Sequence, residues 1–109
     1  MEYRILGKSG LRVSEIGLGG NNFGGRLGEQ ESISVIHQAL EQGINFIDTA
    51  ELYSQGHSEE AVGKGVKGKR SEVIVATKFG YWRDAEPFKG TRGSRSYIMK
   101  AIDGSLKRL

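Results

Sequence analysis

The sequence predicts an α/β fold in which parallel strands alternate with helices. Two apolar runs of strand length cover residues 44–47 and 73–77, and stretches with helical spacing lie before, between and after them. Strands that lie about 30 residues apart with a helix between them form the repeated βαβ unit, whose strands are parallel. A doubly wound sheet would show the same pattern at this length.

The composition is that of a globular chain with one domain at most. Of the 109 residues, 37% are hydrophobic and 27% are charged, as in ordinary folded proteins. No apolar run approaches the roughly 20 residues of a membrane span, and the N-terminus lacks the apolar core of a signal peptide. We therefore expect a cytoplasmic protein without a membrane partner. The absence of cysteine excludes disulfides and thiolate metal sites, and we predict no metal site.

The net charge of +3 and the pI of about 9.3 do not indicate a nucleic-acid partner, because acidic and basic residues are interleaved over most of the chain. The densest basic cluster holds Lys64, Lys67, Lys69 and Arg70. We interpret it as the solvated end of a helix and the turn after it, where cations suit the helix dipole. A phosphate-binding role is the alternative.

The chain is predicted to begin with a β-hairpin and a short strand. Alternating apolar residues flank a turn at 7–10, which predicts a hairpin of residues 3–6 with 12–16. Residues 16–19 form the next strand. Six glycines within residues 17–28 would let this loop approach a ligand closely.

Two helices are predicted to flank the strand that ends at Asp48. The first covers residues 29–42 and stops at Gly43, and its apolar residues at helical spacing are Ile33, Val35, Ile36, Ala39 and Leu40. Ser58 can cap the second helix, with Glu59 and Glu60 favoured in its first turn by the dipole.

Glycines in the second helix predict close packing. Gly63 and Gly65 each cost about 1 kcal/mol against alanine in a helix interior, which argues for close contact between helix and sheet. A third helix starts at about Arg95, and it is expected to bury Ile98, Ala101, Ile102 and Leu106, with Leu109 close to this face.

The glycine-rich loop does not match the dinucleotide-binding fingerprint. Its spacing, Gly17-x-Gly19-x-x-x-x-Gly24, differs from G-x-G-x-x-G, and no acidic residue stands where the ribose partner is expected, Asp48 coming closest. A small nucleotide-binding α/β domain that uses this loop as a phosphate cradle remains an alternative.

Three ionisable side chains follow the ends of the two apolar runs. Asp48 ends the first run, Tyr53 lies five residues later, and Lys78 ends the second. The carboxyl ends of parallel strands carry the chemistry of α/β enzymes. We therefore predict a proton-transfer site formed by these three residues.

Several motifs, taken in order along the chain, carry a resemblance to a known family. They are Leu6-Gly7-x-Ser9-Gly10-Leu11-x-Val13-Ser14, Asn45-Phe-Ile-Asp-Thr-Ala-x-x-Tyr53, Gly56-x-Ser58-Glu59 and Ala76-Thr-Lys78. This ordered set resembles the aldo-keto reductases over nearly the whole chain. The resemblance implies a (β/α)8 TIM barrel capped at its bottom by the N-terminal β-hairpin, a fold that typically needs about 250 residues. Residues 1–109 would then be its first third, a partial, C-terminally truncated domain.

The resemblance implies an oxidoreductase that transfers hydride from NADPH or NADH to a small aldehyde or ketone. Asp48, Tyr53 and Lys78 match three of the family's four catalytic positions. Tyr53 would protonate the carbonyl oxygen. Because a free phenol with a pKa near 10 is a weak acid at neutral pH, Lys78 would favour its phenolate, and Asp48 would hold the lysine charged. The fourth member, a histidine, follows a later strand. Neither His37, expected on or beside the apolar face of the first helix, nor His57 matches its position.

The resemblance also implies part of a cofactor site. Gly20 and Asn21 would touch the nicotinamide end of the cofactor, and Asp48 would lie near its ribose, whereas the adenosine-phosphate pocket comes mostly from later strands. Simple turn chemistry is the alternative for Asn21 and Asn22. Ser54 stands where the family usually has glycine, and we expect this change to be tolerated.

Aromatic residues follow Lys78 in a long loop. We interpret this loop as a mobile segment on the substrate side, whose aromatic residues could line a carbonyl pocket. They are Tyr81, Trp82 and Phe88, with Pro87 between them. Covering a barrel edge or a later loop is the alternative.

An incomplete barrel is expected to be inactive alone. It leaves a sheet edge with unpaired backbone groups, which favours self-association or a complementary chain. The alternative is a non-catalytic binding or regulatory module that reuses the first βα units. Retention of the three candidate catalytic residues counts against that alternative.

Overall fold

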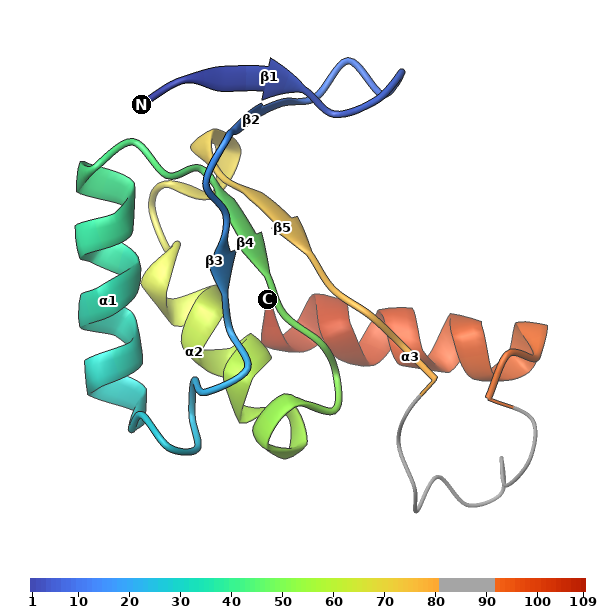
Figure 1. Cartoon of the computed structure of the whole chain (residues 1–109). Coiled ribbons are helices and arrows are strands. Elements are labelled where there is room, and N and C mark those ends of the chain that lie inside the picture. The colour runs from blue at the N-terminus through green and yellow to red at the C-terminus, as the bar shows by residue number, and fades with distance from the viewer. Residues whose placement is uncertain (81–91) are drawn as a thin grey trace.

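The computed structural model describes residues 1–80 and 92–109, which form a β-hairpin and a three-stranded parallel sheet with helices on one side (Figure 1). In the hairpin, β1 (Tyr3–Ile5) pairs antiparallel with β2 (Arg12–Ser14). The parallel sheet has the order β3-β4-β5, and its strands are β3 (Leu18–Gly19), β4 (Phe46–Asp48) and β5 (Ile74–Ala76). The α-helices are α1 (Glu29–Glu41), α2 (His57–Gly65) and α3 (Arg95–Arg108), and two short 3-10 turns are η1 (Tyr53–Gly56) and η2 (Arg70–Glu72). The predicted α/β class, parallel strands and hairpin are confirmed.

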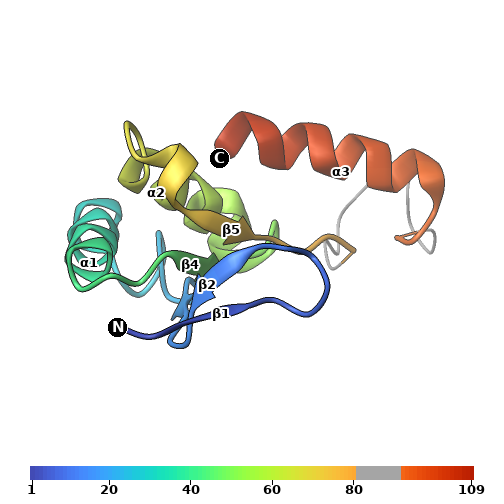
Figure 2. The ribbon, with the colours of Figure 1, turned by 90° about the horizontal axis from the view of Figure 1, so that it is seen from above.

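Strand alternation divides the parallel sheet into two faces. Leu18, Ile47 and Val75 are paired in register, and all three pack in or against the hydrophobic core. Since successive side chains on a strand point to opposite faces, Asp48 points away from this core. The remaining core residues come from the loop after β3, from α1 and α2, and from the residue before β5: Phe23, Ile36, Ala61, Val62, Val66 and Val73. The core therefore lies between the sheet and helices α1 and α2, whose arrangement Figure 2 shows from above.

The hairpin lies across the start of the strands (Figure 1) and is fastened there by polar contacts. The Asn45 side chain accepts a hydrogen bond from the Ser14 backbone N–H at 2.7 Å and donates to the Arg12 carbonyl at 3.0 Å. The Tyr3 hydroxyl donates to the Gly43 carbonyl at 2.8 Å. Gly43 has a φ of +85°, which ends α1 as predicted.

The start of α2 differs from the prediction. Gly56, with a φ of +93°, occupies the N-cap position, and Ser58 lies inside the helix, fully buried. Its hydroxyl donates to the Gly20 carbonyl at 2.7 Å and lies 2.8 Å from the Thr49 hydroxyl. Ser58 is therefore not a cap, because these partners from two other loops hold its side chain.

The glycines of α2 provide close packing, as predicted, but against helices rather than the sheet. A Cβ at Gly65 would lie 2.9 Å from Ile36 of α1, and one at Gly63 would clash with the carbonyl oxygen of Arg108 at the end of α3. Both glycines thus let neighbouring helices approach.

Helix α3 begins at Arg95, as predicted, and the Ser94 hydroxyl caps it by accepting from the Tyr97 N–H at 3.2 Å. Its predicted buried face is confirmed only in part, because Ala101 is buried as predicted, whereas Ile102 is 44% exposed and Leu106 is 69% exposed. The buried residues are Tyr97, Ala101 and Ser105. The small side chains of Ala101 and Ser105 let this face approach the rest of the molecule. The Tyr97 hydroxyl donates a hydrogen bond to a buried acceptor, Glu51, in the loop after β4.

Candidate active site

Strand register brings Asp48 and Lys78 together. Asp48 pairs with Ala76, so Lys78, two residues beyond Ala76, returns to the same face. The Lys78 Nζ donates to both carboxylate oxygens of Asp48 at 2.9 Å and to the Thr49 carbonyl at 2.6 Å. The predicted juxtaposition of these side chains at the carboxyl ends of β4 and β5 is present.

The lysine is held in its charged form. Burial lowers the pKa of Lys78, but hydrogen bonding with Asp48 and Tyr53 and the negative charge of Asp48 raise it more, so the pKa lies above the usual 10.5. The side chains of Asp48 and Lys78 remain 44% and 41% exposed. A ligand can therefore reach both charged groups.

Tyr53 lies beside the pair. The Lys78 Nζ lies 4.8 Å from the centre of the Tyr53 ring, a distance at which a cation interacts favourably with an aromatic face. Tyr53 is half-buried at the start of η1. The structure thus brings all three predicted catalytic side chains to one place.

The turn after Tyr53 has an unusual backbone. Ser54 and Gln55 adopt φ values of +49° and +58°, in the left-handed region that costs a non-glycine residue about 1–2 kcal/mol. Ser54 is the position where the resembled family usually has glycine. Serine adopts here a backbone conformation that favours glycine, and its tolerance stays a prediction.

The glycine-rich loop after β3 packs closely against this turn. A Cβ at Gly24 would lie 2.6 Å from His57, and one at Gly25 would clash with the Ser54 hydroxyl. Close approach by these glycines was predicted toward a ligand, and the structure shows it toward the turn that carries Tyr53.

Gly20 and Asn21 lie at the strand end beside Asp48. Gly20 is buried, and its N–H donates to the Asp48 carbonyl at 2.7 Å. A Cβ there would lie 2.9 Å from the Ser58 hydroxyl, so glycine is required for packing. Asn21 and Asn22 are exposed, which leaves Asn21 accessible at the rim of the site.

Two buried glutamates near the site were not predicted as functional. Glu51 lies between Asp48 and Tyr53 and is 4% exposed, and Glu59 of α2 is fully buried. Glu59 accepts from the Thr77 hydroxyl at 2.6 Å and from Arg108 Nε at 2.6 Å. For Glu51, the sequence offered one signal of burial, namely an acidic residue between the apolar Ala50 and Leu52.

Neither of the two histidines completes the site. His37 lies in α1 and is exposed, so of the two expected placements, on the apolar face or beside it, the first is wrong. His57 is exposed at the start of α2, where its Nδ1 lies 3.1 Å from Glu60. Tyr81, Trp82, Pro87 and Phe88 lie outside the described residues.

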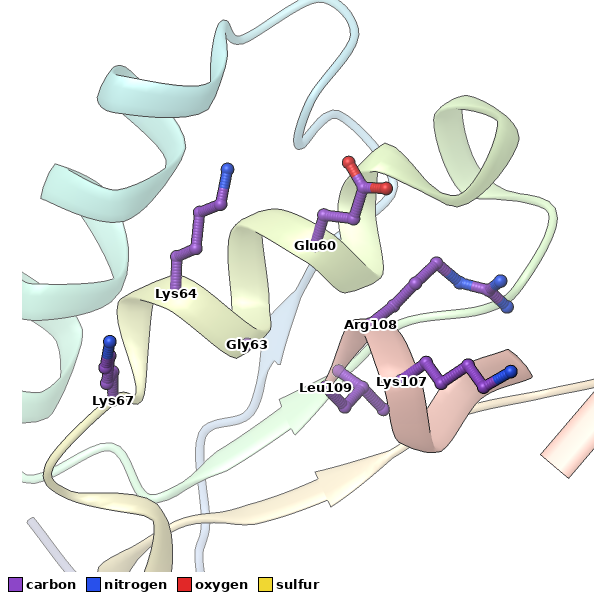
Figure 3. Close-up of a pocket in the computed structure, with 7 residues that line it drawn as sticks. All are labelled: Glu60, Gly63, Lys64, Lys67, Lys107, Arg108 and Leu109. Atoms are coloured by element: carbon purple, nitrogen blue, oxygen red, sulfur yellow. The ribbon is translucent and has the colours of Figure 1, made fainter. Parts of the chain in front are cut away.

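Away from the candidate site, a cavity of about 370 Å³ with several basic side chains lies between α2 and the end of α3 (Figure 3). Its lining residues are Glu60, Gly63, Lys64, Lys67, Lys107, Arg108 and Leu109. Lys64 rises from α2 toward α1, where it pairs with Glu29 at 2.6 Å, and Arg108 pairs with Glu59. Of the predicted basic cluster, Arg70 donates to the Val73 carbonyl at 2.9 Å. Lys64 and Arg108 are thus already paired with carboxylates of the protein itself.

A family model described as Aldo/keto reductase family matches residues 15–109. The chain belongs to the aldo/keto reductase family. It is 43% identical to aldo-keto reductase YhdN of Bacillus subtilis, with all of this chain and 34% of that protein covered. The chain thus spans about a third of the length of this relative.

Solved structures of aldo-keto reductases show the same arrangement. The holo form of AKR11C1 from Bacillus halodurans matches with a TM-score of 0.84 and 40% identity, covering 100% of this chain and 36% of that one. A Klebsiella pneumoniae enzyme in complex with NADP and acetate matches with a TM-score of 0.73 and 28% identity over 89% of this chain and 31% of that one. The fold is the first part of an aldo-keto reductase TIM barrel, and residues 1–80 and 92–109 do not close a barrel.

The described residues hold neither a candidate membrane span nor a candidate metal site. Among the described helices, none is long and apolar enough to cross a membrane. No group of three histidine, aspartate or glutamate side chains in the same part of the chain could hold a metal ion.

Proposed function

We propose that this chain supplies the proton-transfer site of a reductase that moves hydride from NADPH or NADH to a small aldehyde or ketone. The observation that supports this best is the convergence of Asp48, Tyr53 and Lys78 at the carboxyl ends of β4 and β5. Family membership and three-residue geometry point to the same chemistry. A cytoplasmic location is part of the same proposal.

Each side chain has a separate task in this site. Tyr53 donates its phenolic proton to the carbonyl oxygen as negative charge develops there. The charged Lys78 beside the Tyr53 ring stabilises the phenolate that is left. Asp48 binds the lysine through both carboxylate oxygens, which orients the ammonium group and keeps it charged.

The residues present fit the nicotinamide end of the cofactor. Asn21 is exposed and Asp48 is partly exposed beside it, so both offer polar groups to a ribose or a carboxamide. Gly20 keeps the loop close to the site. The bound cofactor would supply the hydride.

We propose that activity requires the remainder of a barrel. Within the described residues, β3 and β5 are the outer strands of the parallel sheet, and each has one side without a paired strand. Such edges bind further strands readily. A complementary chain, a longer form of this chain or a second copy could cover them.

The test compares residues 1–109 alone with the same residues joined to the part of YhdN that they do not cover. Nicotinamide fluorescence follows cofactor binding, and NADPH consumption with a small aldehyde follows reduction. We expect both only in the joined chain, with reduction lost in Tyr53→Phe while cofactor binding is retained. Reduction that survives Tyr53→Phe would contradict the proposal. Tight NADPH binding by monomeric residues 1–109 would instead support a small nucleotide-binding domain.

A further inference from the structure

The carboxylate of Glu51 joins three segments of the chain that meet at the candidate site. Its Oε1 accepts a hydrogen bond from the Gly80 N–H at 2.9 Å and another from the Tyr97 hydroxyl. Gly80 follows the segment that carries Lys78, and Tyr97 lies in the first turns of α3. A side chain that is 4% exposed therefore connects the loop after β4 with both of these segments.

The position of Glu51 explains why its side chain, rather than its main-chain carbonyl, accepts the hydrogen bond from Gly80. The Thr49 N–H donates to the Ala76 carbonyl at 2.8 Å, and the Glu51 N–H donates to the Lys78 carbonyl at 3.0 Å. These bonds extend the ladder between β4 and β5, in which bonds recur every two residues. The next donor is the Gly80 N–H, and its acceptor in a continued ladder would be the Glu51 main-chain carbonyl. The Glu51 side chain accepts this bond instead, at the point where the main chain turns away toward Tyr53.

The hydrogen bond between Gly80 and Glu51 links the segment that carries Lys78 with the segment that carries Tyr53. Tyr53 lies two residues beyond Glu51, and Lys78 lies two residues before Gly80. The Tyr53 N–H also donates to the Ala50 carbonyl at 3.1 Å, which fixes the turn relative to the residue before Glu51. Holding Glu51 against Gly80 therefore holds the Tyr53 turn against the end of β5.

We infer that Glu51 is a positioning residue of the site, whose buried carboxylate sets the placement of the Tyr53 phenol relative to the Lys78 ammonium group. Its relevance to turnover rests on the proposed reductase function. Its effect on the two side chains does not, because it follows from the hydrogen bonds alone. Tyr97 supports Glu51 through its hydroxyl, and its ring lies 6.5 Å from that of Phe79.

The test is a double-mutant cycle read at Lys78 in the joined chain. The pKa of Lys78 is followed by NMR of its side-chain Cε, with and without Tyr53→Phe, and the difference measures the coupling between the two residues. We expect Glu51→Leu, which has similar size but no acceptor, to reduce this coupling by more than half. Glu51→Gln retains an acceptor oxygen and is expected to restore it.

Two outcomes overturn the inference. An unchanged coupling in Glu51→Leu would show that Glu51 does not set the placement. Equal losses in Glu51→Leu and Glu51→Gln would show that the charge of Glu51, rather than its hydrogen bonds, acts on Lys78. If Glu51→Leu does not fold, Tyr97→Phe replaces it, with a partial loss of coupling expected and an unchanged coupling overturning the inference.

A control and a second readout separate positioning from stability. Glu59→Gln alters the other buried glutamate and is expected to lower Tm while the coupling stays unchanged. In turnover, Glu51→Leu should lower kcat by about 10²-fold, as a displacement of about 1 Å at a reacting group can do, with an unchanged KM for NADPH. Failure of the reductase proposal would appear as reduction that is insensitive to Tyr53→Phe, whereas the Lys78 titration does not depend on turnover.

Discussion

The two buried glutamates among the described residues, Glu51 and Glu59, have different surroundings. Glu59 is paired with the guanidinium group of Arg108 and also accepts from the Thr77 hydroxyl. Glu51 accepts from a backbone N–H and a phenol. The first glutamate joins two helices and the end of β5, and the second joins the loops that carry the candidate catalytic residues.

The comparison shows that a buried carboxylate can either stabilise the packing of helices or position the residues of a candidate site. The ion pair of the fully buried Glu59 with the partly exposed Arg108 is costly to break from the arginine side, because removal of Arg108 leaves an uncompensated buried charge. A carboxylate bound by neutral donors fixes the direction of each donor. The region around Glu59 should therefore respond to mutation mainly in stability, and the region around Glu51 mainly in the geometry of Tyr53 and Lys78.

The largest expected effect on activity comes from Lys78→Met. Because it removes the cation beside Tyr53, it should lower kcat for carbonyl reduction by about 10²–10⁴-fold. NADPH oxidation in the joined chain measures this effect. The matched control is Lys64→Met, which breaks an exposed ion pair with Glu29 and should change the free energy of unfolding by less than about 1 kcal/mol. Equal activity in the two variants would contradict the assignment of Lys78.

The largest expected effect on stability comes from Arg108→Met. The Glu59 carboxylate would remain fully buried without its cation, so the free energy of unfolding should fall by about 3–5 kcal/mol. Urea unfolding followed by circular dichroism measures it. Lys107→Met, at the neighbouring position on the exposed face of α3, is the control and should have little effect. A loss below about 1 kcal/mol in Arg108→Met would show that the pair does not hold the helices.

Stability should also fall at alkaline pH for two reasons located at the site. The pKa of Lys78 is raised above 10.5, so its stabilising contribution is complete below 10.5 and is lost as pH rises through its folded value. Burial and the hydrogen bond to Glu51 raise the pKa of Tyr97 to about 12. The folded state therefore retains this phenolic proton between pH 10 and pH 12, where the unfolded state loses it, and stability declines over this interval.

Denaturant titrations between pH 8 and pH 12 test this dependence. Tyr97→Phe removes the tyrosine contribution and should flatten the decline. A decline that is equally steep in Tyr97→Phe would show that Tyr97 titrates normally.

The smallest expected effect comes from Ser54→Gly. It removes the left-handed strain of about 1–2 kcal/mol but adds unfolded-state entropy of about 0.5–1 kcal/mol, so a net gain of up to about 1.5 kcal/mol is expected. Thermal unfolding measures it as a higher Tm. Ser54→Ala, which keeps the strain, should show no such gain. A lower Tm in Ser54→Gly would show that the contact of Ser54 with Gly25 matters more than the strain.

Much of the fold followed from local pattern. The hairpin, the parallel strands, the limits of α1 and the start of α3 were predictable because turn residues and hydrophobic periodicity act over a few neighbouring residues. The pairing of Asp48 with Lys78 was predictable from strand ends and side-chain alternation. The assignment of Tyr53 depended on the family resemblance, since its position relative to Lys78 depends on a turn with two left-handed residues.

Other features were decided by contacts between distant residues. Ile102 and Leu106 of α3 were expected to be buried because they are large and apolar, yet the buried residues are Tyr97, Ala101 and Ser105. The small side chains and the Tyr97 hydroxyl determine which face fits. Ser58 was expected to cap a helix and instead joins two loops.

The sequence by itself determined the order of the elements and the side of the sheet on which Asp48 and Lys78 lie, because both depend on neighbouring residues. Only the tertiary structure decided the partners of Glu51, Glu59 and Ser58. Their hydrogen bonds join residues that are far apart in the chain, and a buried polar group is stable only where those partners meet it.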